Sequence, residues 1–129
     1  MEPDKKIIFK FQMFEQQIQQ LQQQLQAVEQ GIEEMTSLNL ELDELKGSKD
    51  KEILAPIGRG IFAKTKLLSE ELTIDVGGGN FVKKSIPEAK SIIKKQIEKL
   101  EEVKKELENN LEKISEELEK VVGEARGKK

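Results

Sequence analysis

The fold of this chain is decided by residues 53–85, which read ILAPIGRGIFAKTKLLSEELTIDVGGGNFVKKS. This stretch is the only part of the sequence whose apolar residues lack a helical period. Short apolar or alternating runs are separated by glycines, which accept the positive φ angles that tight hairpin turns require. We therefore expect two β-hairpins, formed by residues 52–57 with 61–67 and by residues 72–76 with 81–84.

The predicted hairpins should expose apolar side chains and unpaired strand edges. Pro56 cannot donate a ladder hydrogen bond, so its strand should be an edge strand or should carry a bulge at this point. Two hairpins of this size are marginal alone in water, and their apolar faces need a partner. We expect them to assemble with other chains through open strand edges. The candidate assembly residues are Leu54, Ile57, Ile61, Phe62, Leu72, Ile74, Val76, Phe81 and Val82.

Residues 5–46, before the hairpins, carry a heptad pattern. Their apolar residues recur in alternating steps of three and four, which predicts a helix that supercoils left-handed with a partner helix. Asn39 falls on this seam, Leu38 and Leu45 fall off it, and the glycine at position 47 marks its end. Seam positions a hold Phe11, Ile18, Leu25 and Ile32, and seam positions d hold Ile7, Phe14, Leu21, Val28, Met35 and Leu42.

A glutamine-rich run, residues 16–26, lies within this first helix. By composition alone it could be a low-complexity, aggregation-prone tract. The interleaved Ile18, Leu21 and Leu25 keep the heptad spacing through the run. Because glutamine is a good helix former, we interpret the run as a helix with a neutral outer face.

Residues 85–125 form the second predicted helix. Ser85 and Glu88 match a capping box, and Pro87 is suited to the first turn because its missing N–H is not needed there. Lys104 occupies a seam position, which lowers stability but helps to fix the register. The remaining seam residues are Ile86, Ile93, Leu100, Leu107, Ile114 and Val121 at d, with Ile97, Leu111, Leu118 and Ala125 at a.

An apolar cluster lies where the two helices should meet near the chain ends. Ile8 and Phe9 fall at the outward positions e and f, and an outward apolar cluster usually marks a contact surface. A frayed end, or burial by another copy of the chain, is the alternative. An antiparallel pair of helices would bring the cluster close to the end of the second helix. The candidate contact residues are Ile7, Ile8, Phe9, Phe11, Phe14, Val121 and Val122.

Composition argues against several classes of function. The chain has no cysteine and no histidine, which removes thiolate metal sites and the commonest general base, and we expect no cofactor, no metal and no enzyme activity. The glycines at 77–79 lack the Gly-Lys-Ser/Thr ending of a phosphate-binding loop. Basic residues gather only at Arg126, Lys128 and Lys129, so we expect no nucleic-acid partner. Without a membrane span or signal peptide, the expected location is the cytoplasm.

The hairpin region resembles the alpha class of the prefoldin family. The similarity is carried by residues 53–62 (ILAPIGRGIF), by residues 74–79 (IDVGGG), and by residues 82–85 (VKKS) leading to Glu88 and Ala89. Ala55 stands where valine is usual and Lys83 where glutamate is usual, and the phenylalanines near the N-terminus match no motif of the family. The order of helix, two hairpins and helix extends the resemblance to the whole chain.

The resemblance implies a single prefoldin-like domain over residues 1–129, mainly α with a small β head. It implies a hexamer of two alpha and four beta subunits, in which the β-hairpins form a β-barrel that carries coiled-coil arms. The arm tips would capture unfolded proteins and deliver them to a group II chaperonin without ATP. A structural coiled-coil spacer, or a filament-forming scaffold with a specific docking tip, is the alternative function.

Overall fold

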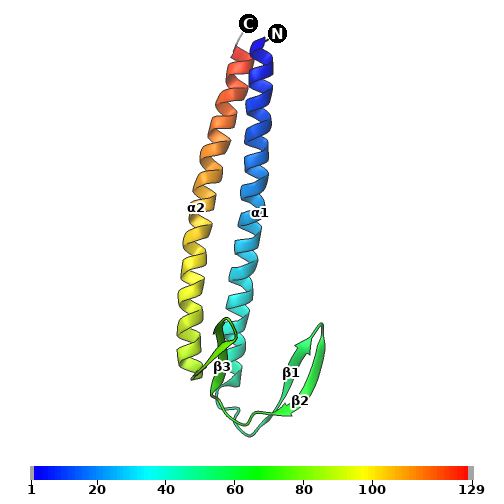
Figure 1. Ribbon diagram of the computed structural model, residues 1–129, viewed down its shortest axis with the longest axis vertical. Helices are drawn as coiled ribbons and strands as arrows, with labels where there is room; N and C mark the ends of the chain where they lie inside the picture. The colour runs from blue at the N-terminus through cyan, green and yellow to red at the C-terminus, as the bar shows by residue number, and fades with distance from the viewer. Residues whose placement is uncertain (1, 128–129) are drawn as a thin grey trace. The chain divides into compact units, whose positions relative to one another are not determined.

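The computed structural model describes residues 2–127, so Lys128 and Lys129 of the basic tail lie outside the described residues. The residues group into two compact units, which we call the terminal unit (up to residue 33 and from residue 98) and the central unit (residues 34–97). The elements, shown in Figure 1, are α1 (Glu2–Leu45), β1 (Glu52–Gly58), β2 (Ile61–Lys66), β3 (Leu72–Gly77), β4 (Asn80–Lys84) and α2 (Ile86–Gly127).

The predicted order of helix, two hairpins and helix is confirmed. β1 pairs antiparallel with β2, and β3 pairs antiparallel with β4, in two separate two-stranded sheets. The helices extend somewhat beyond the predicted bounds, since α1 starts at Glu2 and α2 continues to Gly127. No closed sheet forms among the described strands, and each strand keeps one unpaired edge.

The predicted heptad seam is the less exposed face of both helices in the terminal unit. There, the first part of α1 and the last part of α2 run side by side in opposite directions (Figure 1). Phe11 is the exception, with 36% of its surface exposed. The side chain of Ala125 lies outside the described residues. Half-buried seam residues in this unit are Ile7, Phe14, Ile18, Leu21, Leu25, Val28, Ile32, Leu100, Leu107, Leu111, Ile114 and Leu118, and Val121 is buried.

The core of the central unit joins the helices to the second hairpin. Its buried residues come from α1 and α2, and Leu72 and Ile74 of β3 pack against them. Leu45, predicted to lie off the seam, also packs against this core. The buried residues are Leu42, Ile86, Ala89 and Ile93, and the partly buried ones are Met35, Leu45, Leu72, Ile74 and Ile97.

The start of α2 is fixed by the predicted capping box. The Glu88 N–H donates to Ser85 Oγ at 3.2 Å, and the Ser85 N–H donates to Glu88 Oε1 at 3.1 Å. Hydrogen bonding to the Glu88 carboxylate, first from the Ser85 backbone N–H and then from the Ser85 side chain, holds the pKa of Glu88 below its ordinary value. The capping box therefore places the end of β4 directly before the first turn of α2.

The two hairpins are equivalent, position by position. Each has a two-residue turn at positive φ, formed by Arg59 (52°) and Gly60 (79°) in the first hairpin and by Gly78 (62°) and Gly79 (77°) in the second. Positive φ at both central residues is the type I′ geometry that follows the twist of the strands. Each hairpin also has a bulge just before its turn, and the one between Pro56 and Gly58 confirms the irregularity predicted at Pro56.

The equivalence extends to the surface of the hairpins. A lysine and a glutamate form an ion pair across the strands in both, Lys64 with Glu52 at 3.2 Å and Lys83 with Glu71 at 3.8 Å. A phenylalanine follows each turn at the same place, Phe62 in one hairpin and Phe81 in the other. The region is therefore an internal structural repeat, which the sequence pattern did not predict.

Candidate binding surfaces

Large apolar side chains remain exposed at the end of the terminal unit. Phe9 is 63% exposed, Ile8 55% and Met13 45%, although all three belong to the continuous helix α1. Ile7 and Phe14, the sequence neighbours of Ile8 and Met13, are half-buried on the seam. We call this set the terminal surface, and it consists of Ile7, Ile8, Phe9, Phe11, Met13, Phe14, Val121 and Val122.

One side of the terminal surface is an open apolar hollow of about 450 Å³. It lies between the two helices and contains five of the seven predicted contact residues. Arg126 and Glu15 add one charge of each sign at its margin. The lining residues are Ile7, Ile8, Phe11, Gln12 and Glu15 from α1, with Val121, Val122 and Arg126 from α2.

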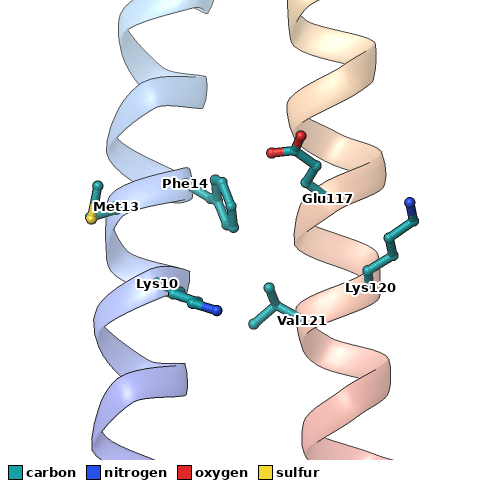
Figure 2. Close-up of a pocket in the computed structure, with 6 residues that line it drawn as sticks. All are labelled: Lys10, Met13, Phe14, Glu117, Lys120 and Val121. Atoms are coloured by element: carbon teal, nitrogen blue, oxygen red, sulfur yellow. The ribbon is translucent and has the colours of Figure 1, made fainter.

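The other side is a smaller hollow of about 280 Å³. Figure 2 shows Phe14 of α1 and Val121 of α2 directed into the space between the helices, with the Lys10 side chain below Phe14 and level with Val121. Glu117 and Lys120 border the hollow from α2, and Met13 borders it from α1. Val121 therefore lies at the base of both hollows and joins the two sides of the terminal surface.

Sequence reasoning placed most, but not all, of these residues. Phe9 lines neither hollow, and its position f points it away from the seam. Met13, Lys10 and Lys120 were not predicted, because they belong neither to the a and d seam nor to the outward apolar pair Ile8 and Phe9. These residues occupy positions c and g, and only the facing helix shows that they border a hollow.

A second exposed apolar surface lies on the hairpins. Ile57 is 69% exposed and its counterpart Val76 60%, while Phe62 is 58% exposed and its counterpart Phe81 63%. Leu54 and Ile61 of the first hairpin are exposed to a similar degree, at 68% and 62%. Of the remaining predicted assembly residues, Leu72 and Ile74 pack in the chain's own core, and Val82 is half-buried.

The hydrophobic residues that pack against the helix core include Leu72 and Ile74 of the second hairpin and, among the described residues, none of the first. At the open end of the first hairpin, backbone hydrogen bonds join the residues before β1 to the residue after β2. The Asp50 N–H donates to the Leu67 carbonyl at 2.7 Å, and the Leu67 N–H donates to the Lys51 carbonyl at 3.0 Å. The loop before β3 is held to the end of α1 by Glu70, whose Oε1 accepts the Gly47 N–H at 2.9 Å. The first hairpin thus leaves apolar side chains of both strands free for a partner.

A polar contact joins the two helices in the central unit. Lys90 of α2 lies on the seam and contacts Asp43 of α1 through its ammonium group. The hydrogen bond from Lys90 is the main cause of the lowered pKa of Asp43. Within residues 2–127, no group of three acidic side chains lies close enough to hold a metal ion. No helix in the described part of the chain is both long and apolar enough to cross a membrane.

Comparisons with known proteins agree with this architecture. The family model for prefoldin subunits matches residues 14–128. Prefoldin subunit alpha of Methanosphaera stadtmanae is 31% identical over 78 residues, which cover 60% of this chain and 51% of that protein. The chain thus matches only about half the length of this curated relative.

A solved structure shares the fold. The cryo-EM structure of filamentous PFD from Methanocaldococcus jannaschii matches with a TM-score of 0.77 and 20% sequence identity, covering 89% of this chain and 97% of that one. At this identity, the likeness concerns the fold alone. The two hairpins and the curated relative match the alpha class of the prefoldin family. Because the family model spans most of the sequence, the chain belongs to the prefoldin family.

Proposed function

We propose that this chain is an ATP-independent chaperone subunit that holds unfolded proteins at its terminal surface. The observation that carries the proposal is the exposure of Ile8, Phe9 and Met13 beside two open apolar hollows. Open, shallow hollows fit apolar segments that lack a fixed shape, whereas catalysis needs an enclosed and ordered site. Membership of a chaperone family supports the same function.

Assembly is proposed to occur through the hairpins. The exposed apolar side chains and the free strand edges support the joining of several hairpins into a β-barrel. We propose beta-class subunits as the partners, in a hexamer of two alpha and four beta chains. Such a complex would act in the cytoplasm and deliver its clients to a group II chaperonin.

A filament-forming scaffold is the second candidate. The structural match to a filamentous relative favours it, as do two equivalent hairpins that could each accept a neighbouring chain. In that case, the terminal surface would be a docking site for one folded partner. The number of different binding partners distinguishes the two functions. A chaperone should bind many unrelated unfolded chains, whereas a scaffold should bind one folded partner.

The test replaces Ile8, Phe9 and Met13 together by serine and assembles the chain with a beta-class prefoldin from the same source. A chemically unfolded, unrelated protein is then diluted into the complex while light scattering reports its aggregation. We expect the wild-type complex to suppress aggregation and the variant to do so clearly less, since it loses apolar contact area.

The matched control replaces Leu38, Leu40 and Val103 by serine, because these residues are also exposed but lie outside the terminal surface. The control should suppress aggregation as the wild type does. Equal suppression by all three complexes would mean that the client site lies elsewhere. If the wild-type complex suppresses nothing, the chaperone function fails and the scaffold becomes the better interpretation.

A further inference from the structure

The glutamine run of α1 lines a groove in the terminal unit. This groove is a third open hollow, of about 340 Å³, between the two helices. Three glutamines of the run and one asparagine of α2 contribute amide groups to it. The lining residues are Gln17, Gln20, Leu21 and Gln24 from α1, with Asn110, Lys113, Ile114 and Glu117 from α2.

This amide groove continues the smaller hollow of the terminal surface. Glu117 lines both of them. The heptad positions agree as well, because each helix contributes its positions c, d and g to both hollows. On α1, Lys10, Met13 and Phe14 of the terminal surface are followed one heptad later by Gln17, Gln20 and Leu21. The groove is thus apolar at one end and lined with amides along the next two turns.

The amides of the groove are free to bind a ligand. Gln17, Gln20, Gln24 and Asn110 are exposed, and their side-chain amides form no hydrogen bond with another described residue. A side-chain amide offers two N–H donors and a carbonyl acceptor, the same groups that a peptide backbone offers in return. Lys113 and Glu117 carry opposite charges, so the groove favours neither acidic nor basic ligands.

We propose that these amides bind the main chain of an extended client segment whose apolar side chains occupy the terminal surface. The inference rests on the proposed chaperone function and specifies which client segments the protein would bind. Backbone N–H and C=O groups are paired inside the secondary structure of a folded protein, whereas an unfolded chain has them free. Amide contacts would therefore select for the unfolded state and leave the client sequence unrestricted.

The length of the groove sets the length of the segment. From Lys10 to Gln24, the helix rises about 21 Å at roughly 1.5 Å per residue. An extended chain covers that distance with about six residues, at roughly 3.3 Å each. A client stretch with a short apolar run next to about three or four small or polar residues fills both parts of the groove.

The test compares two triple variants of the full chain in its native assembly. One replaces Gln17, Gln20 and Gln24 by alanine, which removes the lining amides. The matched control replaces Gln16, Gln19 and Gln23, which lie on the same helix at positions b and f and line no described hollow. Since both variants make the same chemical change, effects on helix propensity cancel between them.

The probe is a labelled synthetic peptide with an apolar half and a half of alternating alanine and serine. A second peptide of the same sequence has N-methylated backbone nitrogens in the alanine–serine half, which removes donors without changing any side chain. Fluorescence anisotropy gives the dissociation constants. We expect the lining variant to bind the first peptide about threefold to tenfold more weakly than wild type and control, as expected for one or two net hydrogen bonds.

N-methylation should weaken binding to the wild type and the control but should have little further effect on the lining variant. The proposal is overturned if the lining variant binds as the control does, or if N-methylation weakens all three proteins by the same factor. In those cases, the terminal surface would still stand as the client site. If the wild type binds neither peptide, the proposed chaperone function fails together with the inference.

Discussion

At the scale of single residues, turn geometry is the clearest link between sequence and structure. Gly60 and Gly79 take positive φ values that glycine adopts without steric cost. Arg59 takes the same kind of conformation, at φ 52°, although a side chain is disfavoured there. The Gly-Arg-Gly sequence predicted the turn, but only the backbone angles identify Arg59 as its strained residue.

Replacing Arg59 by asparagine should stabilise the first hairpin. Asn-Gly is the preferred sequence of a type I′ turn, and the change should raise the free energy of unfolding by roughly 0.5–1 kcal/mol. Thermal unfolding of the full chain measures the shift. Replacing Gly60 by alanine is the opposing control, because a Cβ at φ 79° is strained and should destabilise the protein. A lower melting temperature for Arg59→Asn would contradict the turn assignment.

The capping box predicts a dependence on pH. Because folding lowers the pKa of Glu88, its stabilising contribution is present above the ordinary pKa near 4.5 and is lost as the pH falls through the lowered value. Ser85→Ala removes the hydroxyl partner, so the pKa of Glu88 should rise. NMR titration of the Glu88 carboxyl carbon measures the change. An unaltered pKa in the variant would mean that the Ser85 hydroxyl does not act on the carboxylate.

At the scale of elements, the heptad pattern predicted both helices and their seam, because burial along one face is a periodic signal. The pattern could not show that Leu45 packs against the core, since that contact depends on how residues of α1 and α2 come together in space. It also could not separate seam residues from groove residues such as Met13 and Lys10. A groove residue can be recognised only when the positions of both helices are known, whereas the heptad period describes the faces of one helix at a time.

Asn39 is the polar residue of the α1 seam. Its Oδ1 is buried and has no hydrogen-bond partner among the described residues. Replacing Asn39 by leucine should therefore stabilise the chain by about 1–2 kcal/mol, because an unsatisfied buried acceptor is removed. Urea unfolding measures the gain.

The matched control is Asn109→Leu on α2, where the side chain is exposed and no gain is expected. A polar seam residue commonly fixes the register of paired helices at a cost in stability. A loss of stability in the Asn39 variant would show that the amide has a favourable role in the folded chain.

At the scale of the whole molecule, the balance of buried and exposed apolar groups determines the proposed function. Among the described residues, the buried apolar side chains are Leu42, Ile86, Ala89, Ile93 and Val121. Larger residues on the hairpins and on the terminal surface stay exposed, such as Phe62, Phe81 and Phe9. A chain that buries so little by itself is expected to find partners for both surfaces.

The sequence predicted the two surfaces but not their internal organisation. Ile8, Phe11, Val121 and Val122 were expected to meet, and the structure places them around one hollow. The amide groove was not predicted, because its residues look like an ordinary solvated helix face in the sequence. Only the facing Asn110 and Ile114 of α2 show that the glutamines border a shared groove.

The most direct test of the account is a photo-crosslinking measurement on the assembled complex. A photoreactive amino acid replaces either Met13, which is 45% exposed on the terminal surface, or Val103, which is 42% exposed on α2 outside that surface. After a chemically unfolded client is added and the sample is illuminated, the fraction of chain joined to the client is measured. We expect strong crosslinking from position 13 and little from position 103, because client segments bind at the terminal surface. Equal crosslinking from both positions, or stronger crosslinking from 103, would contradict client binding at the terminal surface.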